Sequence, residues 1–475
     1  MIIKQNIIPV KPIFYNILTN KIVENSEIHN EELDYESICE FVACGFFLED
    51  ATYYKNIKVL KPATEYTIQD GEIISEKVFF KWNYNPIERP LSKVVEEFAE
   101  LFESILDEQT GSKNVILPLS GGLDSRTQAV GLNFLKKQTK SYSYSFKGGL
   151  DEARYGKRIA QKCGFDFNTF IIPKGYLWEE IERLANLNGC YSDFTSPRQM
   201  AVIDAVSHYG EMFSLGHWGD VLFDDMGVPD DISLEEQVDV VFKKIIKNSG
   251  IELAQTLWKE WNLEGDLCEK IKIKIKKNLS DLNIHNSANA SIRAYKSMNW
   301  APRWTSTNLS VFESAHPIKL PYFDNRMCQF ICSVPEKYLS GRQIQIEYIK
   351  YRNPNVAKIE WQDNRPFNLY NYHLNRFPFN FPYRVFSKLS RVFSSVKYVQ
   401  RNWELQFLGS ANAKQLEHQL FDDFTFHKFI PQVIVKEFYE KFKEKDQVYY
   451  SYPITILLTL SMFAKNQSKI NSTSI

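Results

Sequence analysis

This chain lacks paired cysteines, a large excess of charge of either sign and long apolar runs. Its 475 residues carry a formal net charge of −1, so no overall field attracts the chain to a polyanion, and we expect no nucleic-acid partner. The seven cysteines form no Cys-x-x-Cys pair and are odd in number, which supports neither a zinc site nor a disulfide framework. A reduced, cytoplasmic protein is therefore expected.

Targeting and membrane signals are also missing. Residues Met1–Gln5 lack the basic start and apolar core of a signal peptide. The most apolar stretch, 454–464, is too short and too often interrupted by Thr and Ser to span a bilayer. We predict that it forms a buried helix and that the protein has no membrane span.

The length of the chain predicts two or three domains, since one compact core rarely holds so many residues. Aromatic and β-branched residues at 41–47, alternation at 63–68 and the hairpin signal Asp70-Gly71 predict short strands. Two prolines between 86 and 90 punctuate the chain as a linker does. We predict three regions: a small β-rich domain at 1–90, a central domain at 91–350 and a helical region at 351–475.

The central region alternates strands with helices. Strands are expected at Val115–Leu119, Ser141–Phe146 and Thr169–Ile172, with helices at 126–135 and 151–163 between them. Strands separated by helices of this length predict an α/β fold with a doubly wound parallel sheet.

Six residues, Ser120-Gly-Gly-Leu-Asp-Ser125, follow the first of these strands directly and lead into a helix. The two glycines permit a tight turn with N–H groups facing inward. The helix adds unpaired N–H groups and the positive end of its dipole, and Ser120 and Ser125 add hydroxyl donors. The pattern therefore predicts an oxyanion cradle.

This cradle differs from two better-known nucleotide loops. No Gly-Lys-Ser/Thr follows, so it is not a Walker A loop, and the glycine spacing is not that of a dinucleotide fingerprint. An acidic residue inside a phosphate cradle makes sense only with a divalent metal between them. Asp124 is therefore a candidate Mg²⁺ ligand.

The segment 120–125 resembles the pyrophosphate-binding loop of the PP-loop ATP pyrophosphatases. From about residue 41 to 367, the chain resembles the asparagine synthetase family. That family's second acidic segment is echoed by Leu215-Gly-His-Trp-Gly-Asp-Val-Leu-Phe-Asp-Asp225. A later motif is echoed at 316–324, and the segment 340–350 follows where the family has a helix. The central domain would then be a PP-loop ATP-binding synthetase domain.

The resemblance implies ATP and Mg²⁺ as cofactors. It makes Asp220 the second metal ligand beside Asp124, and it puts an apolar side chain, here Phe146, over the adenine ring. Nucleotide contacts are implied for Leu119, Ser120, Gly121, Gly122, Leu123, Ser125, Phe146, Leu215 and Gly216.

The N-terminal part departs from the family. The family's glutaminase uses a cysteine directly after the initiator Met, whereas position 2 here is Ile and the first cysteine is Cys39. Without a thiolate nucleophile no thioester with glutamine can form. Region 1–90 is therefore expected to be a truncated glutaminase-like domain without activity, and ammonia or an amine is the expected nitrogen donor.

Two further positions keep two interpretations each. His217 stands where the family has a Glu, and it is either a base that works near neutral pH or a packing substitution. Arg365 lies nearest to the place of a late catalytic Lys, with Lys358 as the alternative. Arg365 and Lys358 also fit ordinary surface charges.

The function that the resemblance implies is an ATP-dependent amide-forming ligase. It would activate a carboxylate as an acyl-adenylate and release AMP and pyrophosphate. Intramolecular amide formers such as lasso-peptide cyclases and β-lactam synthetases, and amide-decorating enzymes of surface polysaccharides, are alternatives within this class. A nucleotide-binding pseudoenzyme is the alternative from another class, although a buried carboxylate pair is costly without a metal. The acid, the amine and the oligomeric state are left open.

Overall fold

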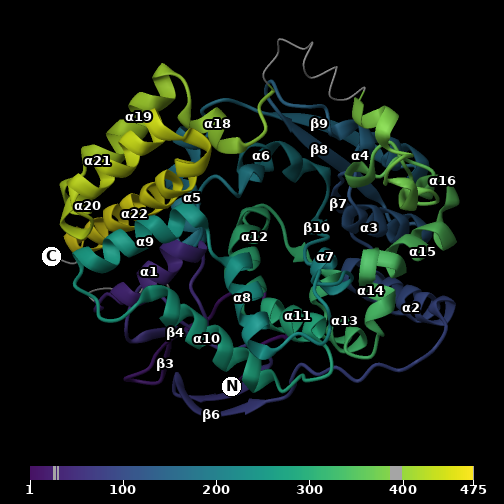
Figure 1. Ribbon diagram of the computed structural model, residues 1–475, viewed down its shortest axis with the longest axis horizontal. Coiled ribbons are helices and arrows are strands. Elements are labelled where there is room, and N and C mark those ends of the chain that lie inside the picture. Colours follow the sequence, from purple (N-terminus) through teal and green to yellow (C-terminus); the bar gives the residue numbers. More distant parts are fainter. Residues whose placement is uncertain (25–27, 29–30, 386–397, 474–475) are drawn as a thin grey trace.

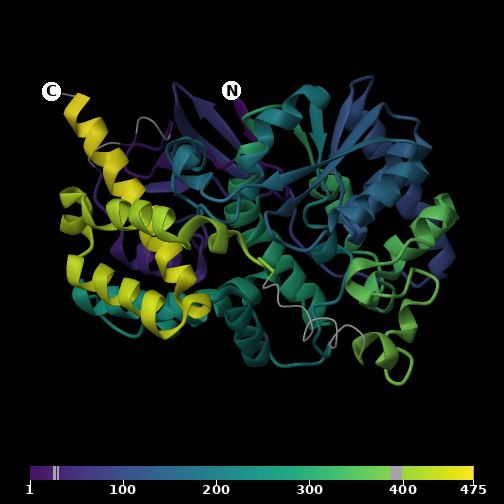
Figure 2. The ribbon, with the colours of Figure 1, turned by 90° about the horizontal axis from the view of Figure 1, so that it is seen from above.

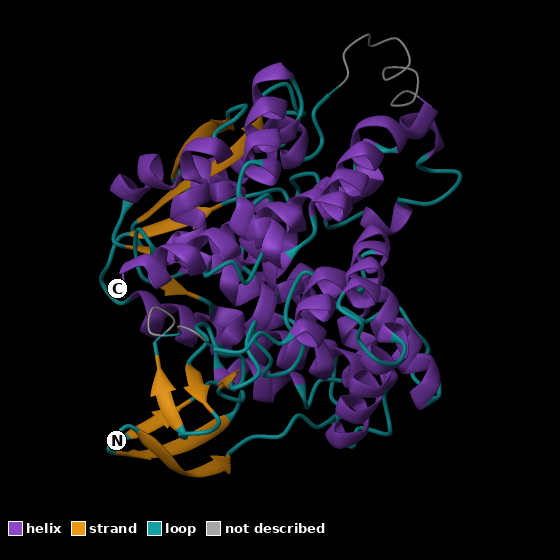
Figure 3. Cartoon of the chain, turned by 90° about the vertical axis from the view of Figure 1, so that its left-hand side faces the viewer, coloured by secondary structure: helices purple, strands orange, loops and turns teal. Residues whose placement is uncertain are grey.

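The computed structural model describes residues 1–24, 28, 31–385 and 398–473. Its strands form two separate sheets, and helices lie between and around them (Figure 3). One sheet is parallel and belongs to the central region. The other is antiparallel and is built by the N-terminal residues.

The parallel sheet confirms the predicted α/β fold. Its strands are β7 (Val115–Pro118), β8 (Thr139–Phe146), β9 (Asp166–Ile172), β10 (Met212–Ser214) and β11 (Ile318–Lys319). Their order is β11-β10-β7-β8-β9, and every neighbouring pair is parallel. The chain order therefore reverses between β7 and β10, and a sheet of this kind opens a crevice at such a point, at the carboxyl ends of the strands.

The N-terminal sheet has the order β1-β5-β6-β3-β2-β4. Its strands are β1 (Ile2–Lys4), β2 (Phe14–Asn16), β3 (Lys21–Val23), β4 (Ile57–Val59), β5 (Thr64–Gln69) and β6 (Glu72–Val78). Asp70 and Gly71 join β5 to β6 with φ angles of 52° and 83°. Two positive φ angles are what a two-residue type I′ hairpin requires, so the predicted hairpin is confirmed.

The strand predicted at 41–47 is wrong, because helix α1 (Tyr35–Cys44) occupies most of it. Asp34 caps the helix by accepting from the Ser37 N–H, and Gly45 ends it in the left-handed conformation. Every residue from Ser37 to Cys44 is buried, partly against α9. A helix with no solvent-facing side shows no amphipathic period, which explains the misleading pattern.

Helices make up most of the remaining chain (Figures 1 and 2). In chain order they are α2 (Leu91–Thr110), α3 (Leu123–Phe134), α4 (Ala153–Cys163), α5 (Leu177–Asn188), α6 (Ile203–Val206), α7 (Gly219–Leu222), α8 (Leu234–Ile245), α9 (Asn248–Glu260), α10 (Leu267–Leu282), α11 (Ala288–Asn299), α12 (Ser306–Glu313), α13 (Asn325–Ile331), α14 (Glu336–Leu339), α15 (Gln343–Arg352), α16 (Pro354–Ala357), α18 (Asn402–Phe407), α19 (Ser410–Phe421), α20 (Phe424–Phe429), α21 (Gln432–Glu440) and α22 (Gln447–Thr473). The predicted buried helix at 454–464 is confirmed as part of α22. Across the described ranges, no helix combines the length and the apolar character needed to cross a membrane.

One large apolar core passes through all three predicted regions. The Tyr53 ring stacks on that of Phe463 with centroids 3.9 Å apart, and the Tyr53 hydroxyl donates to the Cys190 carbonyl over 2.5 Å. Buried Arg303 donates to the carbonyl oxygens of Phe47 and Ala51. These contacts tie the N-terminal part to the central region and the last helix. The division at residues 90 and 350 stays a prediction.

Candidate active site

Two loops meet at the crevice between β7 and β10. One runs from Leu119 to Gly122 and leads into α3, and the other runs from Leu215 to Trp218 and leads into α7. A Cβ on Gly219 would lie 2.8 Å from both Asp124 Cγ and Tyr322 Cε2, well inside van der Waals contact. The start of α7 therefore approaches Asp124 so closely that only glycine fits at position 219.

The first loop brings backbone N–H groups and serine hydroxyls together, and its Gly121 N–H donates to Gln362 Oε1 over 3.2 Å. The Ser120 N–H donates to Ser125 Oγ over 3.1 Å, and the Gly122 N–H donates to Ser120 Oγ over 3.2 Å. Gly122 is extended and no side chain caps α3. The helix thus presents uncapped N–H groups beside two serine hydroxyls, which is an arrangement suited to an oxyanion.

Arg126 holds the back of this loop, and sequence reasoning missed it. Its fully buried guanidinium donates to the carbonyl oxygens of Gly121 (3.0 Å), Ile359 (3.1 Å) and Glu360 (2.8 Å). Burial lowers the pKa of Arg126 to about 10, and the side chain stays charged at neutral pH. Three carbonyl contacts lock the turn against the segment that follows α16.

Asp124 lies in the first turn of α3, facing the second loop. Its Oδ1 accepts from Arg342 Nη2 and, over 3.0 Å, from Gln345 Nε2. About 24% of the side chain is exposed, yet enclosure by protein raises the pKa of Asp124 to about 6. Arg342 lowers that pKa and the nearby Asp220 carboxylate raises it. Neither Arg342 nor Gln345 was identified from the sequence.

The two aspartates fit a magnesium ion. Asp220 is exposed to the cleft and makes no hydrogen bond or ion pair with any residue that the structure describes. The described residues also hold no group of three or more His, Cys, Asp or Glu that could enclose a metal. Mg²⁺ commonly binds through one or two carboxylates and shares its other positions with water and phosphate oxygens, so a pair of carboxylates beside a phosphate cradle suits it.

These loops open into a cleft of about 610 Å³, a size typical of small-molecule sites. Eight of the predicted nucleotide or metal residues line it: Leu119, Ser120, Gly122, Asp124, Ser125, Leu215, Gly216 and Asp220. The predicted catalytic residue His217 does so as well. Gly121, Leu123 and Phe146 do not line it. On the β8 side the lining residues are Tyr142, Ser143 and Tyr144, and the Tyr144 hydroxyl accepts from Arg198 Nε over 2.9 Å.

His217 is enclosed between the second loop and α12. Its ring lies edge-on to Phe312, with centroids 6.2 Å apart. Burial lowers the pKa of His217 to about 4, although Asp220 opposes the shift. Its buried Nδ1 has no hydrogen-bond partner among the described residues. The ring is therefore neutral at pH 7 and keeps a free nitrogen, in contrast to a titration near pH 6.5.

The candidates for the late cation lie outside this cleft. Arg365 lines a neighbouring hollow of about 460 Å³ that shares Glu152 and Gln362 with the cleft. Lys358 is exposed at the end of α16. The cations that line the cleft itself are Arg198 and Lys296.

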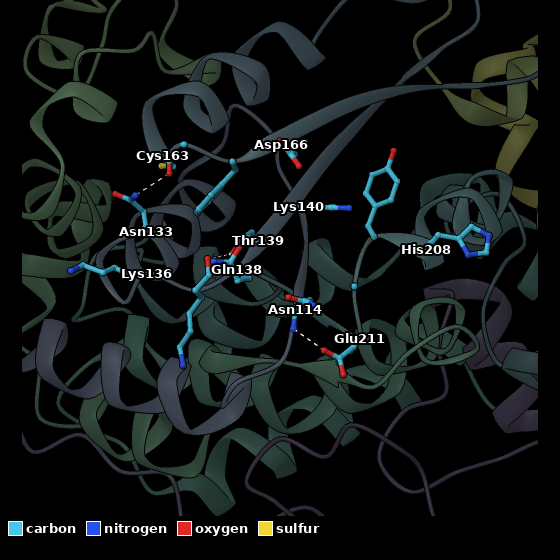
Figure 4. A pocket seen from close by; sticks show the side chains of 15 residues that line it. Asn114, Asn133, Lys136, Gln138, Thr139, Lys140, Cys163, Asp166, His208 and Glu211 are labelled. Atoms are coloured by element: carbon cyan, nitrogen blue, oxygen red, sulfur yellow. Dashed lines mark hydrogen bonds between the residues drawn. The ribbon is translucent and has the colours of Figure 1, made fainter.

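A larger hollow lies at the opposite end of the parallel sheet, where its strands begin (Figure 4). It is lined by residues where the strands begin, such as Asn114, Thr139 and Asp166, and has a volume of about 700 Å³. The Asn114 N–H donates to Glu211 Oε2 over 3.0 Å there. Because doubly wound sheets bind ligands at the carboxyl ends of their strands, this hollow is not the candidate active site.

Comparison with known proteins identifies the family. The asparagine synthase family model matches residues 97–345, more than half of the chain. Asparagine synthetase [glutamine-hydrolyzing] 1 of Bacillus subtilis (strain 168) is 25% identical over 180 residues, which cover 36% of this chain and 28% of that protein. The match thus spans less than a third of that relative's length.

Two solved structures are similar to part of the chain, each with a TM-score of 0.22. One is NH3-dependent NAD synthetase from Campylobacter jejuni subsp. jejuni NCTC 11168 in complex with the nitrate ion, at 14% identity, covering 40% of this chain and 95% of that one. The other is NMN synthetase from Francisella tularensis, at 12% identity, covering 41% of this chain and 96% of that one. On the evidence of the match over 97–345, the chain belongs to the asparagine synthase family.

Proposed function

We propose that this protein is an ATP-dependent ligase that activates a carboxylate as an acyl-adenylate and passes the acyl group to a nitrogen. One observation carries the proposal: the uncapped start of α3 meets the second loop and the start of α7, which contains Asp220, at the crevice. It joins an oxyanion cradle to two carboxylates of one cleft.

In the first step a carboxylate oxygen bonds to the α-phosphorus of ATP, and the bond from that phosphorus to the β-phosphate oxygen breaks. Charge then builds on the departing pyrophosphate. The uncapped N–H groups at the start of α3 and the hydroxyls of Ser120 and Ser125 are suited to stabilise it. Mg²⁺ held by Asp124 and Asp220 would neutralise phosphate charge and orient the leaving group.

In the second step a nitrogen lone pair attacks the acyl carbon, and the bond from that carbon to the AMP oxygen breaks. The attacking nitrogen must lose a proton. His217 lines the cleft and is neutral at pH 7, so it is the base that we assign to this step, and its lowered pKa makes it a weak one. Products are an amide, AMP and pyrophosphate.

Ammonia or an amine is the proposed donor, without glutamine hydrolysis by this chain. A glutaminase of the cysteine type needs an accessible thiolate. Burial raises the pKa of all seven thiols, and none of them lines the cleft: Cys39, Cys44, Cys163, Cys190, Cys268, Cys328 and Cys332.

The proposal is tested by incubating the purified protein with ATP, Mg²⁺ and a panel of carboxylic acids. We expect acid-dependent exchange of labelled pyrophosphate into ATP, and amide formation once ammonium or an amine is added. Exchange without any added amine separates the first step from the second. Formation of ADP and phosphate in place of AMP and pyrophosphate would overturn the proposal.

A further inference from the structure

One wall of the cleft is aromatic and comes from the segment that joins α11 to α12. A π-helical turn at Ala301–Thr305 separates the two helices. On this wall Trp300 and Trp304 approach each other edge to face, with centroids 6.4 Å apart, and both are only partly covered. Phe312 from α12 and Trp218 from the second loop also line the cleft there.

A single cation, Lys296, stands within this aromatic wall. Its Nζ lies 5.3 Å from the centroid of the Trp300 ring and 5.8 Å from that of Trp218. It forms no hydrogen bond or ion pair with any residue in the described part of the chain. Burial lowers the pKa of Lys296, with the Asp220 carboxylate acting in the opposite direction. An ammonium held by rings alone is incompletely compensated, and an anionic ligand would complete its contacts.

Unsatisfied polar atoms add to the same picture. The buried Nε1 of Trp300 has no hydrogen-bond partner among the described residues, and neither has Nδ1 of His217. Both residues line the cleft. Buried polar groups are normally paired, and the unpaired Nε1 of Trp300 belongs to the ring that the Lys296 ammonium contacts.

We propose that this wall binds the carboxylate substrate, and that the substrate is an acid with a bulky apolar or aromatic body rather than aspartate or glutamate. The inference rests on the proposed function, because the acid must lie next to the phosphate loop. Lys296 lines the same cleft as Asp220 and the phosphate loop, where the reacting carboxylate is needed. The tryptophan and phenylalanine rings then enclose the body of the acid.

Charge on this wall argues against an amino acid substrate of the aspartate type. Aspartate carries an ammonium and a second carboxylate, and each needs an opposite charge when it is buried. On this wall Lys296 is the cation available for a carboxylate, Asp220 is assigned to the metal, and Arg198, the other cation that lines the cleft, donates to the Tyr144 hydroxyl on the β8 side. A monocarboxylate with a ring leaves no charge unpaired.

The test compares acids of matched charge in the pyrophosphate exchange assay: aspartate, glutamate, butanoate, 3-phenylpropanoate and 3-(indol-3-yl)propanoate. We expect kcat/KM for the two aryl acids to exceed that for butanoate by about tenfold or more, since an apolar pocket gains roughly 10–200-fold from added apolar groups. Lys296→Met should raise KM for 3-phenylpropanoate about tenfold while leaving KM for ATP unchanged. Trp304→Ala should reduce the preference for aryl acids over butanoate.

Exposed Lys259→Met on α9 serves as the matched control and should change none of these values. Aspartate as the best substrate, or an unchanged KM in Lys296→Met, would overturn the inference while leaving the proposed function standing. Calorimetric binding of 3-phenylpropanoate in the presence of Mg²⁺ and ATP gives a second readout. Binding that is lost in Lys296→Met, without exchange for any acid, would support the subsite and contradict the proposed function. Absence of both binding and exchange would contradict both.

Discussion

Gly219 provides the sharpest steric test of the site. A methyl group added by Gly219→Ala would lie 2.8 Å from Asp124 Cγ and 2.8 Å from Tyr322 Cε2, and closer still to Asp124 Oδ1. Carbon atoms pack best at about 3.5–4.0 Å, so Asp124 or the start of α7 must move by roughly 0.7 Å or more. Tyr322 is fully buried, which leaves the Asp124 carboxylate as the group that moves.

This displacement sets the expected magnitudes. Overpacking of this kind costs about 1–3 kcal/mol of stability. A shift near 1 Å in a catalytic group costs roughly a hundredfold in rate. We therefore expect Gly219→Ala to remain folded and to lose pyrophosphate exchange by about a hundredfold, measured beside thermal unfolding of the same preparation.

Gly164→Ala is the matched control. Gly164 ends α4 with φ +69° and has no atom within 4 Å of an added Cβ, so the substitution costs about 1–2 kcal/mol through backbone strain alone. It should lower the unfolding temperature to a similar extent and leave exchange intact. If Gly219→Ala keeps exchange within a few fold of the unaltered protein, the two loops do not meet as described.

Three further predictions concern the chemistry. Asp124→Asn and Asp220→Asn should each reduce exchange by about a hundredfold or more, measured at saturating Mg²⁺, because each removes charge next to the leaving group. The pKa of His217 is about 4, below its ordinary 6.5, so the neutral form of this group stabilises the folded state above pH 6.5. That stability is lost as the pH falls from 6.5 towards 4. The titration of His217 should therefore leave the rate of amide formation unchanged between pH 6.5 and 8. His217→Gln should keep exchange and lose amide formation, and loss of neither would assign the residue to packing. Glutamine should release no glutamate with this chain, and steady glutamate release in an ammonia-free assay would refute that.

The parallel sheet could be predicted because its signals are local. Strands β7, β8 and β9 alternate with helices in sequence, and the two turn residues Asp70 and Gly71 are enough to predict the hairpin. Helix α1 could not be predicted from periodicity, because its burial on all sides hides the helical period. Asp34 before it and Gly45 after it are the capping signals that could have identified it.

The candidate site likewise has a part that local sequence predicts and a part that it does not. The cradle at 120–125 follows β7 closely, so local sequence indicates it, whereas Asp220 was identified through the resemblance of 215–225 to a family motif. Arg342 reaches Asp124 from 218 residues away, and no spacing rule connects the two. Lys296 likewise enters the cleft through the packing of α11 against α7, a contact that local sequence does not encode.

The central claim is that the carboxylate attacks the α-phosphorus of ATP, and oxygen isotope transfer tests it most directly. An acid that the protein accepts as a substrate would be labelled with ¹⁸O in its carboxylate and supplied with ATP, Mg²⁺ and ammonium. The phosphorus-containing products would then be analysed by mass spectrometry. Our account predicts one ¹⁸O atom in AMP and none in pyrophosphate, because the bridging oxygen stays with AMP when the carbon–oxygen bond of the acyl-adenylate breaks. Label in inorganic phosphate, accompanied by ADP, would contradict the account.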